Sequence, residues 1–235
     1  MILQGLPGGG ALAVAQPDHA ALAGRLAEAW DDALTPAFRT AVAHHDDVWL
    51  VRDAMPPWSP ATGLPESFLE LSHTERRTVW ERASELAGPL GAEAELWILR
   101  HAVRLHAHFD EAGLKAMTAQ LADRAATLVE ELREEHGPRF DDTALARGTA
   151  LFALLDTIAL RLSLGVREPV AAGVLTLRPV SDDRVEVAPW PFTGERVETH
   201  LMARTLPGQV ESREALDAAW AATPAEARPV VLVRG

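Results

Sequence analysis

The stretch Ala150-Leu151-Phe152-Ala153-Leu154-Leu155-Asp156-Thr157-Ile158-Ala159-Leu160 places a single carboxylate inside an otherwise apolar segment. Almost every direction around a helix of this sequence is apolar, so we expect the Asp156 side chain to be buried in the core. A buried and unpaired charge costs several kcal/mol. Asp156 therefore needs a cation, a strong hydrogen-bond partner or a raised pKa.

Three earlier helical patterns also carry ionisable residues on apolar stripes: His19, His45 with Asp46 beside it, and His101. His44 is the alternative inward member of its pair, but it lies about 100° away from the apolar stripe, so we favour His45. A single histidine on an apolar face is more often a hydrogen-bonded core residue than a ligand. The joint pattern, with Asp156, predicts one buried metal-binding cluster.

The composition restricts the kind of metal site. The 235 residues are 48% hydrophobic and can fill the core of one sizeable domain. The sequence has no cysteine, which excludes thiolate zinc sites, iron-sulfur clusters and a disulfide scaffold. Imidazole and carboxylate ligands suit iron, manganese or zinc, so we expect one or two such divalent ions.

The net charge of -12 argues against nucleic acid or a membrane surface as the main partner, because both are anionic. The first residues lack the basic and long apolar regions of a signal peptide, and no apolar run approaches the length of a spanning helix. We therefore expect a cytoplasmic protein with a small-molecule substrate, anions included. A homodimer stays open.

The periodicity predicts a mainly helical fold with an N-terminal β-hairpin in residues 2–15 and a small C-terminal α+β extension. We place the helical metal-binding domain with its hairpin at residues 1–168 and the extension, packed on it, at 169–235. The predicted helices are residues 16–30, 35–52, 73–87, 90–109, 111–135 and 141–165. The extension has strand patterns at residues 174–177, 185–187 and 230–233 and a short helix at 212–222, and residues 54–71 read as a proline-rich loop.

The order His, His-Asp, His and a late Asp on helices resembles the HD-domain superfamily. That resemblance implies an HD-like helical bundle in which His19, His45, Asp46 and Asp156 form the basic metal set. His101 would match one of the further histidines that accompany a second metal, and His108 is a weaker candidate for another.

A closer resemblance, to the uncharacterised bacterial family called domain of unknown function 3891, covers almost the whole chain. This family implies no assigned activity. The matching stretches are Gln16-Pro17-Asp18-His19, Leu22-Ala23, His45-Asp46-Asp47-Val48-Trp49, Thr62-Gly63-Leu64-Pro65, Phe68-Leu69-Glu70, His101-Ala102-Val103-Arg104-Leu105, Leu154-Leu155-Asp156, Leu160, Leu162 and Pro189-Trp190-Pro191-Phe192.

Our leading functional hypothesis is a metal-dependent hydrolase of a phosphate ester or a related small molecule, in which the metal activates water. Arg104 lies close to His101 on the same predicted helix and is our candidate catalytic residue for holding the anion. The alternative for Arg104 is a salt bridge to a surface carboxylate.

Two further hypotheses keep the cluster but change its task. With iron, an HD-like site can work on dioxygen, which would make the protein an oxygenase. Without metal, the histidines and aspartates would form a buried polar network in a non-catalytic binding or scaffold protein.

Overall fold

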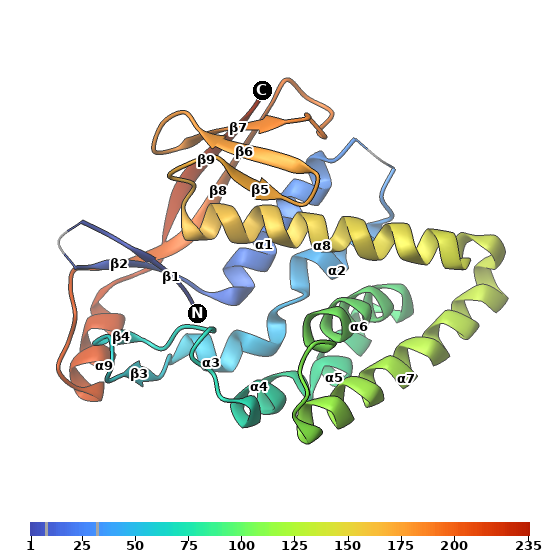
Figure 1. Ribbon diagram of the computed structural model, residues 1–235, viewed down its shortest axis with the longest axis horizontal. Helices are drawn as coiled ribbons and strands as arrows, with labels where there is room; N and C mark the ends of the chain where they lie inside the picture. The colour runs from blue at the N-terminus through green and yellow to red at the C-terminus, as the bar shows by residue number, and fades with distance from the viewer. Residues whose placement is uncertain (8, 32) are drawn as a thin grey trace.

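A curled seven-stranded sheet covers one side of a helical body (Figure 1). The computed structural model describes residues 1–7, 9–31 and 33–235. Helices make up 53% and strands 20% of the chain, which is an α/β fold. The expectation of a mainly helical, all-α HD-like bundle is therefore wrong.

The sheet joins the two ends of the sequence. Its strand order is β1-β2-β8-β9-β7-β6-β5, and among the described strands only β7 and β9 pair in parallel. The N-terminal hairpin is present, with Ile2 opposite Val14, but β2 continues into the sheet by pairing with β8, Ala11 opposite Leu206. The strand bounds are β1 (Ile2–Gly5), β2 (Ala11–Val14), β5 (Val170–Ala172), β6 (Leu175–Pro179), β7 (Arg184–Ala188), β8 (Arg196–Leu206) and β9 (Glu226–Arg234).

The sequence analysis missed the short strand β5, two short strands within residues 54–71 and the long strand β8, and β8 changes the fold class. Its residues Val197, Leu201 and Ala203 are buried, and even numbers of positions separate them, as expected for side chains on one face of a strand. Because β8 pairs with β2 on one side and β9 on the other, hairpin and extension form one sheet. The division of the chain at residue 168 stays a prediction.

The helices pack under the sheet. In Figure 1, α1 and α8 lie next to the strands, and α6 and α7 lie on the side away from them. The helix bounds are α1 (Gln16–Ala29), α2 (Pro36–His44), α3 (Leu50–Ala54), α4 (His73–Trp80), α5 (Ala83–Ala87), α6 (Ala92–His106), α7 (Ala112–His136), α8 (Asp142–Leu164) and α9 (Arg213–Ala222). Three short 3₁₀ segments connect them: Asp47–Trp49, Gly88–Leu90 and Gly137–Phe140.

Helix α8 carries Asp156 through the centre of the molecule. The Asp141 side chain caps it by accepting from the Ala144 amide (2.8 Å), and Gly165, at φ 81°, ends it. In the described part of the chain, α8 is the one helix that is long and apolar enough to cross a membrane. Core helices of soluble proteins meet the same criterion of length and composition. We expected no apolar run of such length.

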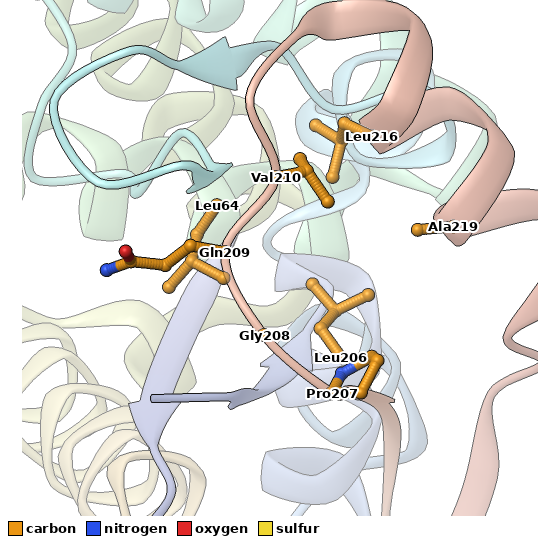
Figure 2. A pocket seen from close by; sticks show the side chains of 8 residues that line it. All are labelled: Leu64, Leu206, Pro207, Gly208, Gln209, Val210, Leu216 and Ala219. Atoms are coloured by element: carbon orange, nitrogen blue, oxygen red, sulfur yellow. The ribbon is translucent and has the colours of Figure 1, made fainter. Parts of the chain in front are cut away.

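The proline-rich loop, residues 54–71, contains a two-stranded hairpin, β3 (Trp58–Ser59) with β4 (Leu64–Pro65). The Gly63 carbonyl accepts from the Val210 amide (2.7 Å), which ties the loop to the C-terminal third of the chain. A small apolar cavity of about 280 Å³ lies at this junction (Figure 2). The loop is therefore fastened to the body at this end.

Candidate metal centre

His19 lies in the first turn of α1, and a buried carboxylate fixes where that turn begins. Ala15 provides no side-chain cap, and instead Asp53 accepts from the Gln16 amide (2.7 Å). The second Asp53 oxygen accepts from the Met1 amino group (3.0 Å). Asp53 thus holds α1, and with it His19, in position.

His45 follows the last residue of α2, and the helix ends there rather than at Arg52 as predicted. Asp46 leaves the helical conformation, with φ −108° and ψ 17°. On a continuous helix the two neighbouring side chains would point about 100° apart. The break allows both to face the same interior point, with 3.6 Å between His45 Nε2 and Asp46 Oδ2.

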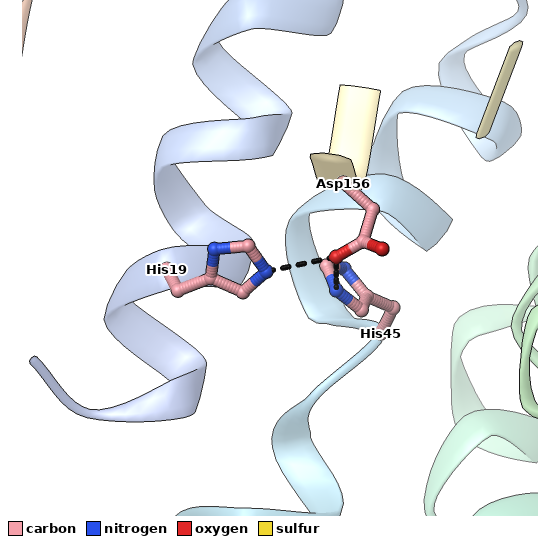
Figure 3. A group of neighbouring side chains, drawn as sticks. All are labelled: His19, His45 and Asp156. Atoms are coloured by element: carbon pink, nitrogen blue, oxygen red, sulfur yellow. Dashed lines mark hydrogen bonds and ion pairs between the residues drawn. The ribbon is translucent and has the colours of Figure 1, made fainter. Parts of the chain in front are cut away.

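Asp156 is the centre of the cluster (Figure 3). Its Oδ1 atom lies 2.9 Å from His19 Nε2 and 3.4 Å from His45 Nε2. One ligand atom from each of these three residues lies within 4.8 Å of the others. Donors bound to one ion at about 2.1 Å in a tetrahedral site are about 3.4 Å apart, so side-chain movements of up to about 1 Å would bring all three to one ion.

His101 and Arg104 approach the other oxygen of the same carboxylate. His101 Nε2 and Arg104 Nη2 each lie 3.8 Å from Asp156 Oδ2. The His101 ring packs on Phe152, at 4.8 Å between centroids, and meets the His45 ring edge-on at 5.0 Å. The close group of possible ligands therefore consists of His19, His45 and Asp156. Asp46 approaches this group through His45, and His101 and Arg104 lie at its edge, while the roles of all six residues stay predictions.

The His45 ring has a fixed tautomer. Its Nδ1 donates to the Val42 carbonyl (2.8 Å), which can only accept, so Nδ1 carries the hydrogen. In the neutral ring, Nε2 then presents a lone pair, and it faces the oxygens of Asp46 and Asp156. Lone pairs and carboxylate oxygens repel one another unless a cation or an added proton lies between them.

The charges of the cluster follow from burial and from these contacts. Burial opposes the charged form of His45, but the carboxylates of Asp46 and Asp156 raise its pKa to about 9. Burial lowers the pKa of His101 to about 3, so this ring is neutral. Burial raises the pKa of Asp46. For Asp156 the burial effect is outweighed by His101, His19 and His45, which hold its pKa well below 3.8.

Several buried nitrogen atoms of the cluster have no hydrogen-bond partner among the described residues. They are His45 Nε2, His19 Nδ1 and both ring nitrogens of His101. A buried polar atom without a partner costs about 1–3 kcal/mol, so native proteins rarely leave several together. The donor set, imidazole nitrogen with carboxylate oxygen, fits a borderline divalent cation such as zinc, manganese or iron.

The other histidines lie away from this point. His44 is 46% exposed and bonds to Asp47 (2.9 Å), and His108 is exposed beside Phe109. Sequence reasoning missed Asp53 and the aromatic wall formed by Phe152. Neither had a usable signal, because Asp53 follows the predicted end of a helix at Arg52 and Phe152 looks like any apolar core residue.

The family model described as "Protein of unknown function (DUF3891)" matches residues 1–208. The match includes every residue of the cluster and the strand β8, and it confirms the resemblance to this family. No curated protein and no solved structure matches the chain significantly. The chain therefore belongs to the DUF3891 family of proteins of unknown function.

Proposed function

We propose that this protein is a metal-dependent hydrolase of a phosphate ester or a related small anion. His19, His45, Asp46 and Asp156 would hold the ion, with His101 at its edge. One observation carries the proposal: the Val42 carbonyl fixes the His45 tautomer so that Nε2 points between two carboxylates. The order of these residues, which resembles the HD-domain metal set, supports the same ligands without requiring the HD fold.

A divalent cation bound here would supply a Lewis acid and lower the pKa of a water molecule to near neutrality. The protein's own residues would orient the reaction. Asp156 is mostly buried, at 13% side-chain exposure, and its charge at neutral pH holds the surrounding imidazoles in place. The His101 ring is neutral and lies 3.8 Å from Asp156 Oδ2, so it would serve as an uncharged ligand at the edge of the ion.

Arg104 would bind the anion of the substrate. Its side chain is 42% exposed, so an incoming anion can reach it from solvent. At 3.8 Å, the contact with Asp156 is longer than a hydrogen bond, which leaves the guanidinium donors free for a second acceptor. A surface salt bridge would use those donors instead.

One observation favours the metal-free alternative. With a pKa of about 9, His45 is protonated at neutral pH and can donate from Nε2 to Asp156. In a non-catalytic protein that proton would supply the hydrogen bond between His45 and Asp156. It would leave His101 Nε2, which faces Asp156, without a partner, whereas an ion bound between these residues would engage that nitrogen, so we favour the metal.

The test compares two neighbouring histidines. We expect the purified protein to hold about one equivalent of metal, His45→Ala to hold less than about a tenth of that, and His44→Ala to hold the wild-type amount. Elemental analysis measures all three, and hydrolysis of aryl phosphate esters should follow metal content. Equal metal in the two variants would contradict the site. Retained iron, with an absorbance change in air, would instead favour the oxygenase.

Metal affinity should also depend on pH. Because a cation must displace the proton from His45, we expect affinity to rise about tenfold per pH unit between about pH 7 and 9. In the metal-free protein the sign is opposite, since a raised pKa stabilises the fold below about pH 6.5 and that stabilisation is lost as the pH approaches 9. Competition with a chelator of known affinity, and urea denaturation without metal, measure the two effects. A pH-independent affinity would contradict a proton at this position.

A further inference from the structure

A second cavity, of about 610 Å³, lies outside the metal centre and has an aromatic wall. Four aromatic side chains contribute to it: Trp30, Phe38, Trp97 and Phe140. Phe38 and Trp97 meet edge to face, at 5.2 Å between ring centroids. A volume of this size holds a small organic molecule, and such a wall favours a flat apolar one.

One aromatic ring, that of Phe152, lies between this wall and the metal cluster. Phe38 contacts Phe152 at 5.7 Å between centroids, and Phe152 contacts His45 and His101. The cluster residues do not line the cavity. The two sites are therefore neighbours on either side of Phe152, and different residues line them.

The indole of Trp97 can lie flat against α8 because residue 148 has no side chain. A Cβ atom on Gly148 would lie 2.3 Å from Trp97 Cη2, which is shorter than any tolerated contact. Trp97 is 6% exposed, and its Nε1 has no hydrogen-bond partner among the described residues. The close fit against Gly148 therefore fixes the position of the Trp97 ring in the wall.

The rim of the cavity is basic in a protein of net charge -12. Among the described residues that line it, Arg139 and Arg147 are basic and Glu93 is acidic. Glu93 is already engaged, because it accepts from Arg139 (2.9 Å) and from the Thr35 hydroxyl (2.5 Å). Arg147 is exposed and makes no ion pair with another residue that the structure describes. The Arg147 guanidinium is therefore available to pair with one acidic group of a ligand.

We propose that this cavity binds a small aromatic monoanion, with its flat body against Phe38 and Trp97 and its acidic group at Arg147. The site is distinct from the metal centre and does not depend on the proposed hydrolase activity.

Three probes test the charge and the shape of the ligand by titration calorimetry: 2-naphthoate, the neutral 2-naphthalenemethanol, and the linear anion decanoate. We expect saturable binding of 2-naphthoate, about tenfold tighter than either of the other two. Arg147→Gln should weaken 2-naphthoate about tenfold and leave the alcohol unchanged. The control Arg184→Gln removes a charge elsewhere on the surface and should change neither. Equal affinity for 2-naphthoate and decanoate, or no binding of 2-naphthoate, would overturn the proposal.

Two further variants locate the ligand. Ala150 and Ala146 are both exposed on α8, but only Ala150 lines the cavity. We expect Ala150→Trp to weaken 2-naphthoate at least tenfold and Ala146→Trp to leave it within twofold of wild type. Binding should also survive in His45→Ala and in the presence of a chelator. Loss of binding in either of these conditions would place the anion on the metal and overturn the assignment.

Discussion

Asp156→Asn should remove metal binding while the protein still folds. The substitution keeps the shape of the side chain but replaces the charged oxygen that faces His19 and His45 with a neutral amide. Loss of one ligand lowers metal affinity by more than the roughly 10–100-fold that loss of a supporting residue costs. We expect a fall of at least about 100-fold for zinc or manganese, and hydrolysis of phosphate esters should be lost with it.

Thermal denaturation with and without added metal measures this change. At a free metal concentration about 1,000 times the wild-type dissociation constant, binding stabilises the wild type by about 4 kcal/mol. Asp156→Asn, with an affinity at least about 100-fold lower, should gain no more than about 1.4 kcal/mol. Asp47→Asn is the matched control, since that carboxylate lies close in the chain but bonds to the outward-facing His44. A metal-induced stabilisation of normal size in Asp156→Asn would show that the ion, if bound, lies elsewhere.

The cluster itself followed from local sequence patterns. Asp156 stands alone in an apolar segment, and His19 and His101 occupy apolar stripes of clear helices, so burial could be predicted at each position. Burial of all three in one domain of this size restricts them to a common core. Asp46 reaches the cluster because the helix ends after His44, and no capping residue or proline in the sequence predicts that helix end.

The sheet could not be predicted in the same way, because its decisive contacts link distant residues. Ala13 opposite Arg204 joins segments separated by most of the chain, and no local period encodes which strands will pair. β8 also alternates imperfectly: Thr199 and His200 interrupt the buried positions, which weakens its signal. The same physics explains why helices were found and the fold class was wrong: helical contacts are local in sequence, and sheet contacts are not.

The approach of α1 to α2 depends on a glycine, and it sets the distance between two predicted ligands. A Cβ atom on Gly24 would lie 2.5 Å from Ala43 Cβ and 2.9 Å from Ala43 Cα. The second of these atoms is backbone, so a side chain at residue 24 must push the two helices apart. His19 and His45 come from these helices, and their rings meet at 5.4 Å between centroids.

Gly24→Val should therefore both destabilise the protein and move His19 away from His45. Inserting extra carbon atoms into a well-packed core lowers the free energy of unfolding by about 1–3 kcal/mol. Because the valine methyl groups would meet backbone atoms, we expect a loss of about 3 kcal/mol, which is a fall of roughly 10 °C in Tm. Gly208→Val is the control, since a Cβ there meets no atom within 4 Å, and it should change stability by less than about 0.5 kcal/mol. Adding Ala43→Gly to Gly24→Val should recover part of both stability and metal affinity. Recovery of neither would mean that the helix spacing does not control the site, because the double variant removes the methyl group that the valine first meets.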